Sequence, residues 1–162
     1  MRRLFETILL GVSIVVCAAV SRAGSEVPLD RVLGPWLTEK EGAVIEIYQC
    51  RETKDLCGRI AWLREPFHEN GELKRDPDNP DESLRGRPLC GIEVFTELAR
   101  IDGDTWAHGH VYNPKDGNRY RAYLNANADG TLHIRGYIGI PLIGKSETWQ
   151  RPEGIDIGCP AG

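Results

Sequence analysis

The feature that most constrains the fold of this chain is a regular series of short runs rich in β-branched and aromatic residues, divided by turn signals. Runs of this kind, with hairpin-sized gaps between them, are typical of antiparallel β-strands. Turn signals lie at 102–104, 113–118 and 129–130. The expected strands are one around Trp36 and seven at 44–48, 58–63, 91–98, 106–112, 120–124, 132–137 and 147–151.

About eight strands in up-and-down antiparallel order favour a closed barrel, because closure leaves no exposed strand edge. We therefore predict an all-β fold, an eight-stranded up-and-down antiparallel barrel, with a short helix only at 28–33. The chain of 162 residues is long enough for one domain, which we place at 24–162. Its 41% hydrophobic and 27% charged residues exclude a disordered chain, a coiled coil and a polytopic membrane protein.

Residues 1–23 have the pattern of a secretory signal peptide. A basic pair at 2–3 precedes an apolar run at 8–20 that is too short to span a bilayer well. Small residues follow at Ser21 and Ala23, the two positions that a signal peptidase reads. We expect cleavage after Ala23 and a periplasmic or secreted protein. The alternative is an N-terminal anchor that is retained.

Loss of residues 1–23 would make the remaining protein more acidic. Lys and Arg fall from 20 to 17 and Asp and Glu from 24 to 23, so the net charge moves from −4 to −6. Nucleic acids and anionic membranes both require clustered positive charge. We therefore expect no nucleic-acid partner, no binding to anionic membranes, and no membrane span after cleavage of the signal peptide.

Four cysteines remain after cleavage, an even number that predicts two disulfides in an oxidising compartment. Three pairings are possible. In one of them Cys50 pairs locally with Cys57 across a hairpin tip, and Cys90 then ties Cys159 in the C-terminal tail to the sheet. A zinc site is the alternative use of these residues, but the six-residue gap of the first pair is wide for a usual zinc knuckle.

One long segment, 64–89, interrupts the strand pattern. It has little apolar content and carries four turn signals, which are Asn70-Gly71, Asp76-Pro77, Asn79-Pro80 and Arg87-Pro88. Loops of this length often act as lids or binding loops, and the alternative is a solvated surface excursion.

The two ends of the strand series carry a shared signature. Gly34-x-Trp36 opens the first strand and Trp149-x-Arg151 closes the last, which resembles the lipocalin and wider calycin group. The resemblance implies that the Arg151 guanidinium covers the Trp36 indole at the closed end of a barrel.

More specifically, residues 34–151 resemble the secreted bacterial family known as domain of unknown function 2147. The further residues that carry this resemblance are Ile47-Tyr48-x-Cys50, Leu56-Cys57-Gly58-Arg59-Ile60, Asp78-Asn79-Pro80, Arg85-x-Arg87-Pro88-Leu89-Cys90-Gly91, Tyr112-Asn113-Pro114-x-x-Gly117, Tyr120 and Arg135-Gly136-Tyr137. The resemblance implies an exported, lipocalin-like barrel. It implies no reaction, because the family has no established activity.

Catalytic and metal-binding patterns are weak in this sequence. His108 and His110 alternate on one expected strand, and His133 could join them on a metal, but no acidic partner is fixed beside them. The two also stand where the family resemblance implies smaller residues. No nucleophile elbow and no acid–base pair is evident, so an enzyme ranks behind a binding protein and no metal or cofactor is expected.

The candidate ligand-binding residues combine arginine with aromatic side chains. Exposed Arg85 and Arg87, beside Asn79, suit a carboxylate or phosphate, and the alternative is that they pin the long loop to the barrel. Aromatic side chains could line a barrel cavity or fill it, namely Trp62, Tyr112, Tyr120, Tyr123 and Tyr137.

Two functions follow from these residues. The first is an exported protein that holds a small amphipathic or apolar ligand in the mouth of the barrel, under the loop at 64–89. The second is a non-catalytic envelope interaction module with a filled barrel that acts through this loop.

Overall fold

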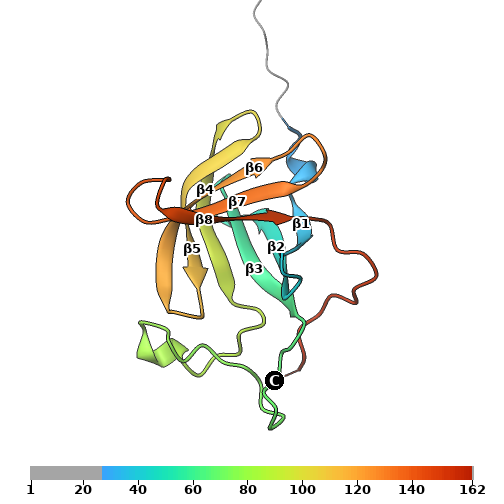
Figure 1. Cartoon of the computed structure of the whole chain (residues 1–162), viewed down its shortest axis with the longest axis vertical. Helices are drawn as coiled ribbons and strands as arrows, with labels where there is room; N and C mark the ends of the chain where they lie inside the picture. Colours follow the sequence, from blue (N-terminus) through green and yellow to red (C-terminus); the bar gives the residue numbers. More distant parts are fainter. Residues whose placement is uncertain (1–26, 162) are drawn as a thin grey trace, which may run out of the picture.

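Eight antiparallel strands follow one another in chain order across one sheet (Figure 1). The computed structural model describes residues 27–161, so the expected signal peptide at 1–23 lies outside the described residues. The strands are β1 Gly34–Leu37, β2 Ala43–Gln49, β3 Leu56–Leu63, β4 Glu93–Asp102, β5 Thr105–Asn113, β6 Asn118–Ala126, β7 Leu132–Tyr137 and β8 Gly144–Trp149. Two 3₁₀ helices accompany them, η1 Leu29–Arg31 and η2 Glu82–Leu84.

The predicted all-β class and up-and-down order are confirmed, and every run expected to be a strand overlaps an observed one. The predicted helix at 28–33 is the single 3₁₀ turn η1. The last strand was expected at 147–151 but lies at Gly144–Trp149. The difference arises because β8 pairs with β7 along its whole length, with Gly144 opposite Tyr137 at the loop end.

The sheet curls strongly, so that its last strand returns to its first. In the described part of the chain the two edge strands meet at one antiparallel bridge, between Leu37 and Gln150. These residues exchange backbone hydrogen bonds of 2.8 and 3.2 Å. β1 has only four residues and offers β8 little backbone to pair with. The sheet is therefore a half-barrel joined at one point, rather than a barrel closed along its edges.

Aromatic and cationic groups cap the end of the half-barrel near this bridge. The Arg151 guanidinium lies 3.7 Å from the centroid of the buried Trp36 ring. It also donates to the backbone carbonyls of Pro35 at 2.9 Å and Arg31 at 2.8 Å, while the Trp36 indole donates to the Val32 carbonyl at 2.7 Å. The cap thus joins the segment before β1 to the segment after β8.

Large apolar side chains fill the concave side of the sheet. Phe95 on β4 packs edge-to-face against Trp149 on β8, with ring centroids 5.5 Å apart. The largest of the fully buried apolar side chains are Trp36, Trp106, Phe95, Leu56, Leu98, Leu124 and Leu132. Burial of each such side chain stabilises the fold by about 1.5–3 kcal/mol, so this face forms the core of the protein.

Two disulfides cross-link segments that lie outside or at the ends of the strands. Cys50 bonds to Cys57 across the β2–β3 hairpin, and Cys90 bonds to Cys159, 69 residues further along the chain. This is the pairing in which the first bridge is local. The second bridge holds the C-terminal segment against the end of the long loop.

Candidate ligand-binding site

The long loop between β3 and β4 is anchored to the sheet by a buried carboxylate. In Figure 1 the loop runs beneath the ends of β4, β5 and β6. Asp76 has no exposed surface and accepts three kinds of donor. The Tyr112 hydroxyl of β5 donates to it at 2.6 Å and the Asn79 amide at 2.7 Å. Arg87 donates from Nη2 at 2.9 Å and from Nε at 3.1 Å.

The Asp76 carboxylate pairs with the charged guanidinium of Arg87 and with the neutral phenol of Tyr112. Burial alone would raise the pKa of the Asp76 carboxyl, but the hydrogen bonds that it accepts and the positive charge of Arg87 outweigh burial and hold that pKa below its ordinary 3.8. Burial, and then the hydrogen bond to Asp76, raise the pKa of Tyr112 to about 12. At neutral pH the carboxylate is therefore ionised and the phenol protonated, as the observed hydrogen bonds require.

A glycine lets the loop approach the turn between β5 and β6. Gly117 has φ +68°, a conformation that side chains with a Cβ rarely adopt. A Cβ built at Gly117 would overlap the backbone carbonyl oxygen of Asp78 in the loop. The loop therefore contacts the turn backbone to backbone at Gly117, four residues after Asn113, whose carbonyl accepts from the Gly117 amide at 3.0 Å.

Local hydrogen bonds hold the part of the loop that follows. The Asn79 side-chain oxygen accepts from the Asp81 amide at 2.9 Å. The Asp81 carboxylate in turn accepts from the backbone and hydroxyl of Ser83 and caps η2. Arg85 donates to the Asn79 carbonyl at 2.9 Å and pairs with Glu82 at 3.2 Å. The loop from 76 to 87 is thus ordered by polar contacts instead of an apolar core of its own.

A pocket of about 320 Å³ lies between this ordered loop and the outer face of the sheet. Phe95 points to the core, so its strand neighbours Val94 and Thr96 alternate to the opposite, outer face and line the pocket. The loop contributes Asn79, Pro80, Asp81, Leu84 and Arg87, and the strands add Glu93, His110, Tyr112 and Arg119.

The charged groups around the pocket differ in whether they already have partners. Asp81 caps η2, and Glu93 accepts the Tyr48 hydroxyl at 2.7 Å. Within residues 27–161, the side chains of His110 and Arg119 make no hydrogen bond or ion pair. They lie on adjacent strands, where Tyr112 pairs with Arg119 in the β5–β6 register. The pocket thus has acids that are engaged and nitrogen donors that are available, an arrangement that suits an anionic group.

The structure brings together only some of the residues that sequence reasoning proposed as a ligand site. Asn79, Arg87 and Tyr112 meet at the pocket, with Asp76 behind them. Arg85 lies beside it, engaged with the loop as described above. Here the arginines make the loop-pinning contacts that were the alternative interpretation.

The other three aromatic candidates lie elsewhere. Trp62 is half-buried at the end of β3. The Tyr120 hydroxyl donates to Asp116 in the β5–β6 turn at 2.7 Å. Tyr137 does not face the interior. A Cβ built at its neighbour Gly136 would point inward at Val111, so strand alternation turns Tyr137 outward, where its ring centroid lies 6.4 Å from that of Tyr123. These three side chains do not form one cavity with the loop.

Sequence reasoning missed Asp76, Thr96 and Arg119 as parts of the site. Arg119 could have been found from the turn at 113–118, since a tight hairpin there pairs it with Tyr112 across the two strands. Asp76 carries no comparable signal, because nothing in the sequence distinguishes a buried aspartate from the exposed ones around it.

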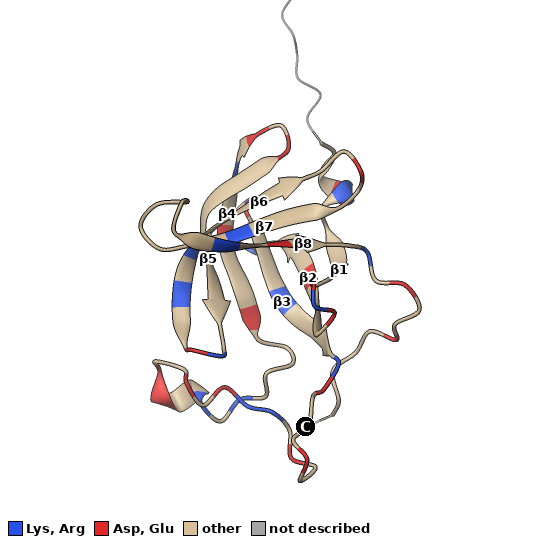
Figure 2. Ribbon diagram, viewed as in Figure 1, with Lys and Arg blue, Asp and Glu red and all other residues tan. Residues whose placement is uncertain are grey.

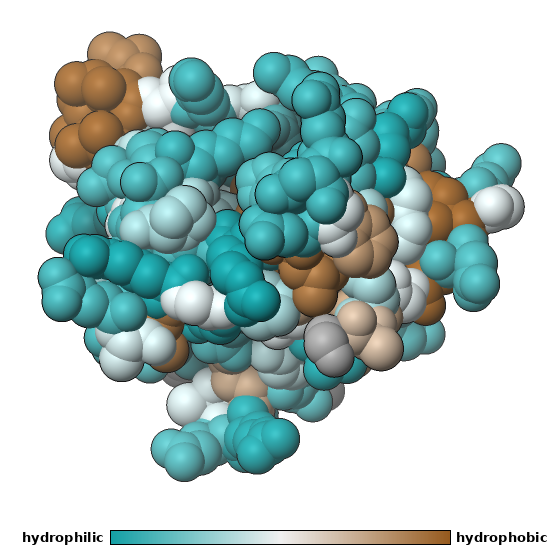
Figure 3. Space-filling model, turned by 90° about the horizontal axis from the view of Figure 1, so that it is seen from below, coloured by the Kyte–Doolittle hydropathy of each residue, from teal (hydrophilic) through white to brown (hydrophobic). Residues whose placement is uncertain are grey.

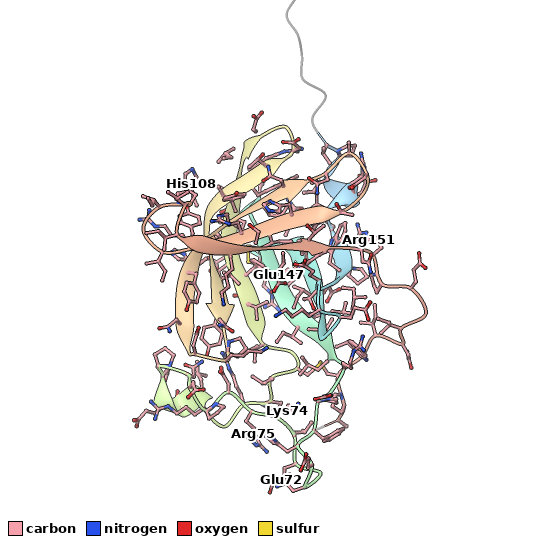
Figure 4. All side chains as sticks on the ribbon, in the orientation of Figure 1. Glu72, Lys74, Arg75, His108, Glu147 and Arg151 are labelled. Atoms are coloured by element: carbon pink, nitrogen blue, oxygen red, sulfur yellow. A yellow bond between two sulfur atoms is a disulfide. The ribbon has the colours of Figure 1, made fainter. Side chains whose placement is uncertain are left out.

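The three histidines of the suggested metal site do not form a group of metal ligands. His110 lines the pocket, whereas His133 lies on β7 with its ring 6.0 Å from that of Tyr123. His108 is exposed at a bulge with φ +67°, far from Lys74 and Arg75 of the long loop (Figure 4). No group of three or more His, Cys, Asp or Glu side chains placed to hold a metal ion occurs among residues 27–161.

Comparison with known proteins identifies the family of the sequence and a solved structure with a similar fold. Residues 34–151 match the family described as "Uncharacterized protein conserved in bacteria (DUF2147)". The chain belongs to the DUF2147 family. This match spans the loop, the pocket and all eight strands, so the site lies wholly within the DUF2147 region. No curated protein matches the chain.

One solved structure shows the same architecture as this DUF2147 chain. It is protein HP1028 from Helicobacter pylori, which is described as belonging to the lipocalin family. The TM-score is 0.63 with 21% identity, and the match covers 75% of this chain and 83% of that one. The likeness establishes a lipocalin-like fold. No helix among the described residues of the DUF2147 chain is long and apolar enough to cross a membrane.

Proposed function

We propose that the protein is an exported binding protein that holds a small amphipathic ligand with an acidic group between its long loop and the outer face of β4, β5 and β6. The observation that carries the proposal is the pair of unengaged nitrogen-bearing side chains, His110 and Arg119, beside acids that already have partners. A carboxylate or phosphate would complete their hydrogen bonding, and Arg binds both groups well.

The remaining walls of the pocket suit the apolar part of such a ligand. Pro80, Leu84 and Val94 supply apolar surface opposite the polar groups. A volume of about 320 Å³ lies at the small end of the range for ligand sites. We therefore infer a ligand with a short chain or a single ring, instead of a long lipid that would need a deep barrel cavity.

Arg87 acts in this proposal as a positioning residue. Two of its nitrogens are committed to Asp76, so it holds the loop over the pocket and adds positive charge near the ligand. Asn79 has the same role, since its amide contacts both Asp76 and, at 3.3 Å, the Tyr112 hydroxyl. The acidic group of the ligand would then contact Arg119 and His110.

Export fits the covalent structure of the chain. The family is bacterial, and both disulfides join cysteines of the described domain. Disulfides persist in oxidising compartments such as the periplasm and the extracellular space. This supports the prediction of a signal peptide at 1–23 and a periplasmic or secreted location.

One observation favours the second function, an envelope interaction module. The concave face of the sheet is packed with buried tryptophan, phenylalanine and leucine side chains, as a filled barrel requires. A partner would then contact the exposed outer side of the loop, where residues 80–86 are all exposed. The two functions share the loop and differ in whether the pocket beneath it holds a small molecule.

Native mass spectrometry of protein purified without detergent separates these two functions. Binding predicts a reproducible extra mass that is lost on denaturation. Arg119→Gln should remove this mass, while Arg121→Gln, two residues along the same strand and outside the pocket, should retain it. The binding proposal is contradicted if neither the parent nor the Arg121→Gln protein carries an extra mass. Capture of a partner through the loop by these same two proteins would then support the second function.

A further inference from the structure

The connection between β7 and β8 exposes an unusually apolar tip. Residues 138–143, which we name the apolar loop, consist of three isoleucines, one leucine, one proline and one glycine. Four of their side chains are largely exposed, at 64% for Ile138, 55% for Ile140, 85% for Leu142 and 61% for Ile143. In Figure 3 apolar side chains gather in a knob that projects from one corner of the molecule. Contiguous exposed apolar surface of this kind marks an interaction site.

Most backbone polar groups of the apolar loop are paired within the protein. Ile138 donates to the Ile143 carbonyl at 2.9 Å, and Ile143 donates to the Ile140 carbonyl at 3.0 Å. Arg135 on β7 donates to the carbonyls of Pro141 and Leu142 at 2.6 and 3.2 Å. A loop whose polar backbone groups are paired in this way can enter an apolar environment at a lower desolvation cost.

Positive charge surrounds the base of the apolar loop, although the protein as a whole is acidic. The segments 117–127 and 130–146 contain Arg119, Arg121, Arg135 and Lys145 and no acidic residue. In Figure 2 blue segments lie next to the loop and the loop itself carries no charge. Charges beyond about 8–10 Å are largely screened at physiological salt, so this local cluster acts independently of the net charge.

The first acidic residue after the apolar loop turns away from it. Glu147 pairs with the core residue Ile134 in the β7–β8 register and so faces inward. Its carboxylate accepts the Trp149 indole at 2.8 Å, and Figure 4 shows it within the curl of the sheet. The outer surface beside the loop carries Arg121, which is opposite Tyr137 in the β6–β7 register, and the rings of Tyr123 and Tyr137. Lys145 is opposite Gly136, so it lies on the same side of β8 as Glu147, where it is exposed at the base of the loop.

We infer that the apolar loop inserts into the surface of an anionic lipid membrane, with Arg121 and Lys145 contacting lipid headgroups. Apolar residues at a tip, basic residues behind them and tyrosines at the level between are the arrangement of proteins that bind at the interface. A projecting tip of six residues also presents little of the flat area, about 800 Å² per partner, that a stable protein–protein interface buries. This inference runs against the expectation of no binding to anionic membranes, which was drawn from net charge alone, and the experiment below decides between the two.

Vesicle flotation tests the inference. The purified protein is mixed with vesicles of phosphatidylglycerol and phosphatidylethanolamine or of phosphatidylcholine alone. Protein should float with the first and stay behind with the second, and Leu142→Glu should lower the bound fraction about tenfold. The same change at Ile101, which is 53% exposed on β4, is the matched control and should leave binding intact. The double variant Arg121→Gln, Lys145→Gln should weaken binding and flatten its dependence on salt.

All variants must share one N-terminus, verified by mass, because the apolar run at 8–20 would itself bind lipid if it were retained. The inference is overturned if the parent protein does not float with anionic vesicles, or if Leu142→Glu and Ile101→Glu behave alike. It is also overturned if the protein dimerises and Leu142→Glu abolishes dimers without affecting flotation, since the loop would then bind a second copy of the chain.

Discussion

Two of the loops that leave this sheet are ordered by opposite physical means. The long loop between β3 and β4 is polar and folds back onto the outer face, where Asp76 binds three partners in a buried site. The apolar loop between β7 and β8 is hydrophobic and projects away, held by its own backbone and by Arg135. Hydropathy alone would have predicted the reverse, with the apolar segment packed and the polar one solvated.

The comparison shows that backbone and charge satisfaction, rather than side-chain hydropathy, decide how each loop lies. A carboxylate such as Asp76 can be buried because every partner it needs is supplied by the loop itself and by Tyr112. The apolar loop is exposed, and basic side chains lie at its base: Arg121 is opposite Tyr137, the residue before the loop, and Arg135 donates to the Pro141 carbonyl.

The largest effect is expected from Asp76→Ala. The substitution leaves Arg87 and Tyr112 without their acceptor, and breaking a buried charge pair costs about 3–5 kcal/mol. Because the Arg87 side chain is 32% exposed, we expect about 3 kcal/mol in the free energy of unfolding, together with rapid proteolysis within 64–92. Asp78→Ala, an exposed residue two positions away, should change neither by much. Equal losses from both variants would show that Asp76 does not anchor the loop.

Gly117→Ala should have the next largest effect. The new methyl group meets the Asp78 carbonyl and forces a positive φ on alanine, so we expect a loss of about 2 kcal/mol and a loop that opens. Gly130→Ala is the matched control, because Gly130 also has a positive φ but faces open space. It should cost about 1 kcal/mol and leave the loop resistant to protease. Loop opening in the control would contradict the proposed contact.

Changes in pH should weaken the same anchor at both extremes. The pKa of Asp76 is lowered by folding, so its contribution is present above its ordinary 3.8 and is lost as the pH falls through the lower folded value. The pKa of Tyr112 is raised from 10.0 to about 12, so its contribution is present below 10.0 and is lost between those values. Protease sensitivity of 64–92 should rise in both windows. A profile unchanged by Asp76→Asn in the acid window would rule out this carboxylate as its source.

The smallest effect is expected at the apolar loop. Leu142→Ser removes a side chain that is 85% exposed, so the free energy of unfolding should stay within about 0.5 kcal/mol. Urea denaturation of the two proteins measures the difference. A loss well above this value would mean that Leu142 packs against the protein in solution, and it would remove the basis for a membrane-binding tip.

Much of the fold could be predicted from sequence because its determinants are local. Alternating apolar residues and hairpin turns fixed the strands, and the Trp36 and Arg151 signature located the cap. The extent of barrel closure was overestimated, because the four residues of β1 cannot pair with the whole length of β8. The candidate ligand-binding site was harder to predict, because Asp76, Arg119 and His110 come from three separate segments. Tyr137 was proposed as cavity-lining although its position on β7 turns it outward.

The central claim is that an acidic ligand binds between the long loop and the outer face of the sheet. The most direct test is an NMR titration of the ¹⁵N-labelled protein with octanoate, which supplies a carboxylate and a short apolar chain. We expect saturable amide shifts that cluster at 79–87, 94–96, 110–112 and 119 and that are lost in Arg119→Gln. Shifts centred on the interior indoles of Trp36, Trp106 and Trp149, or no saturable shifts at all, would contradict the central claim.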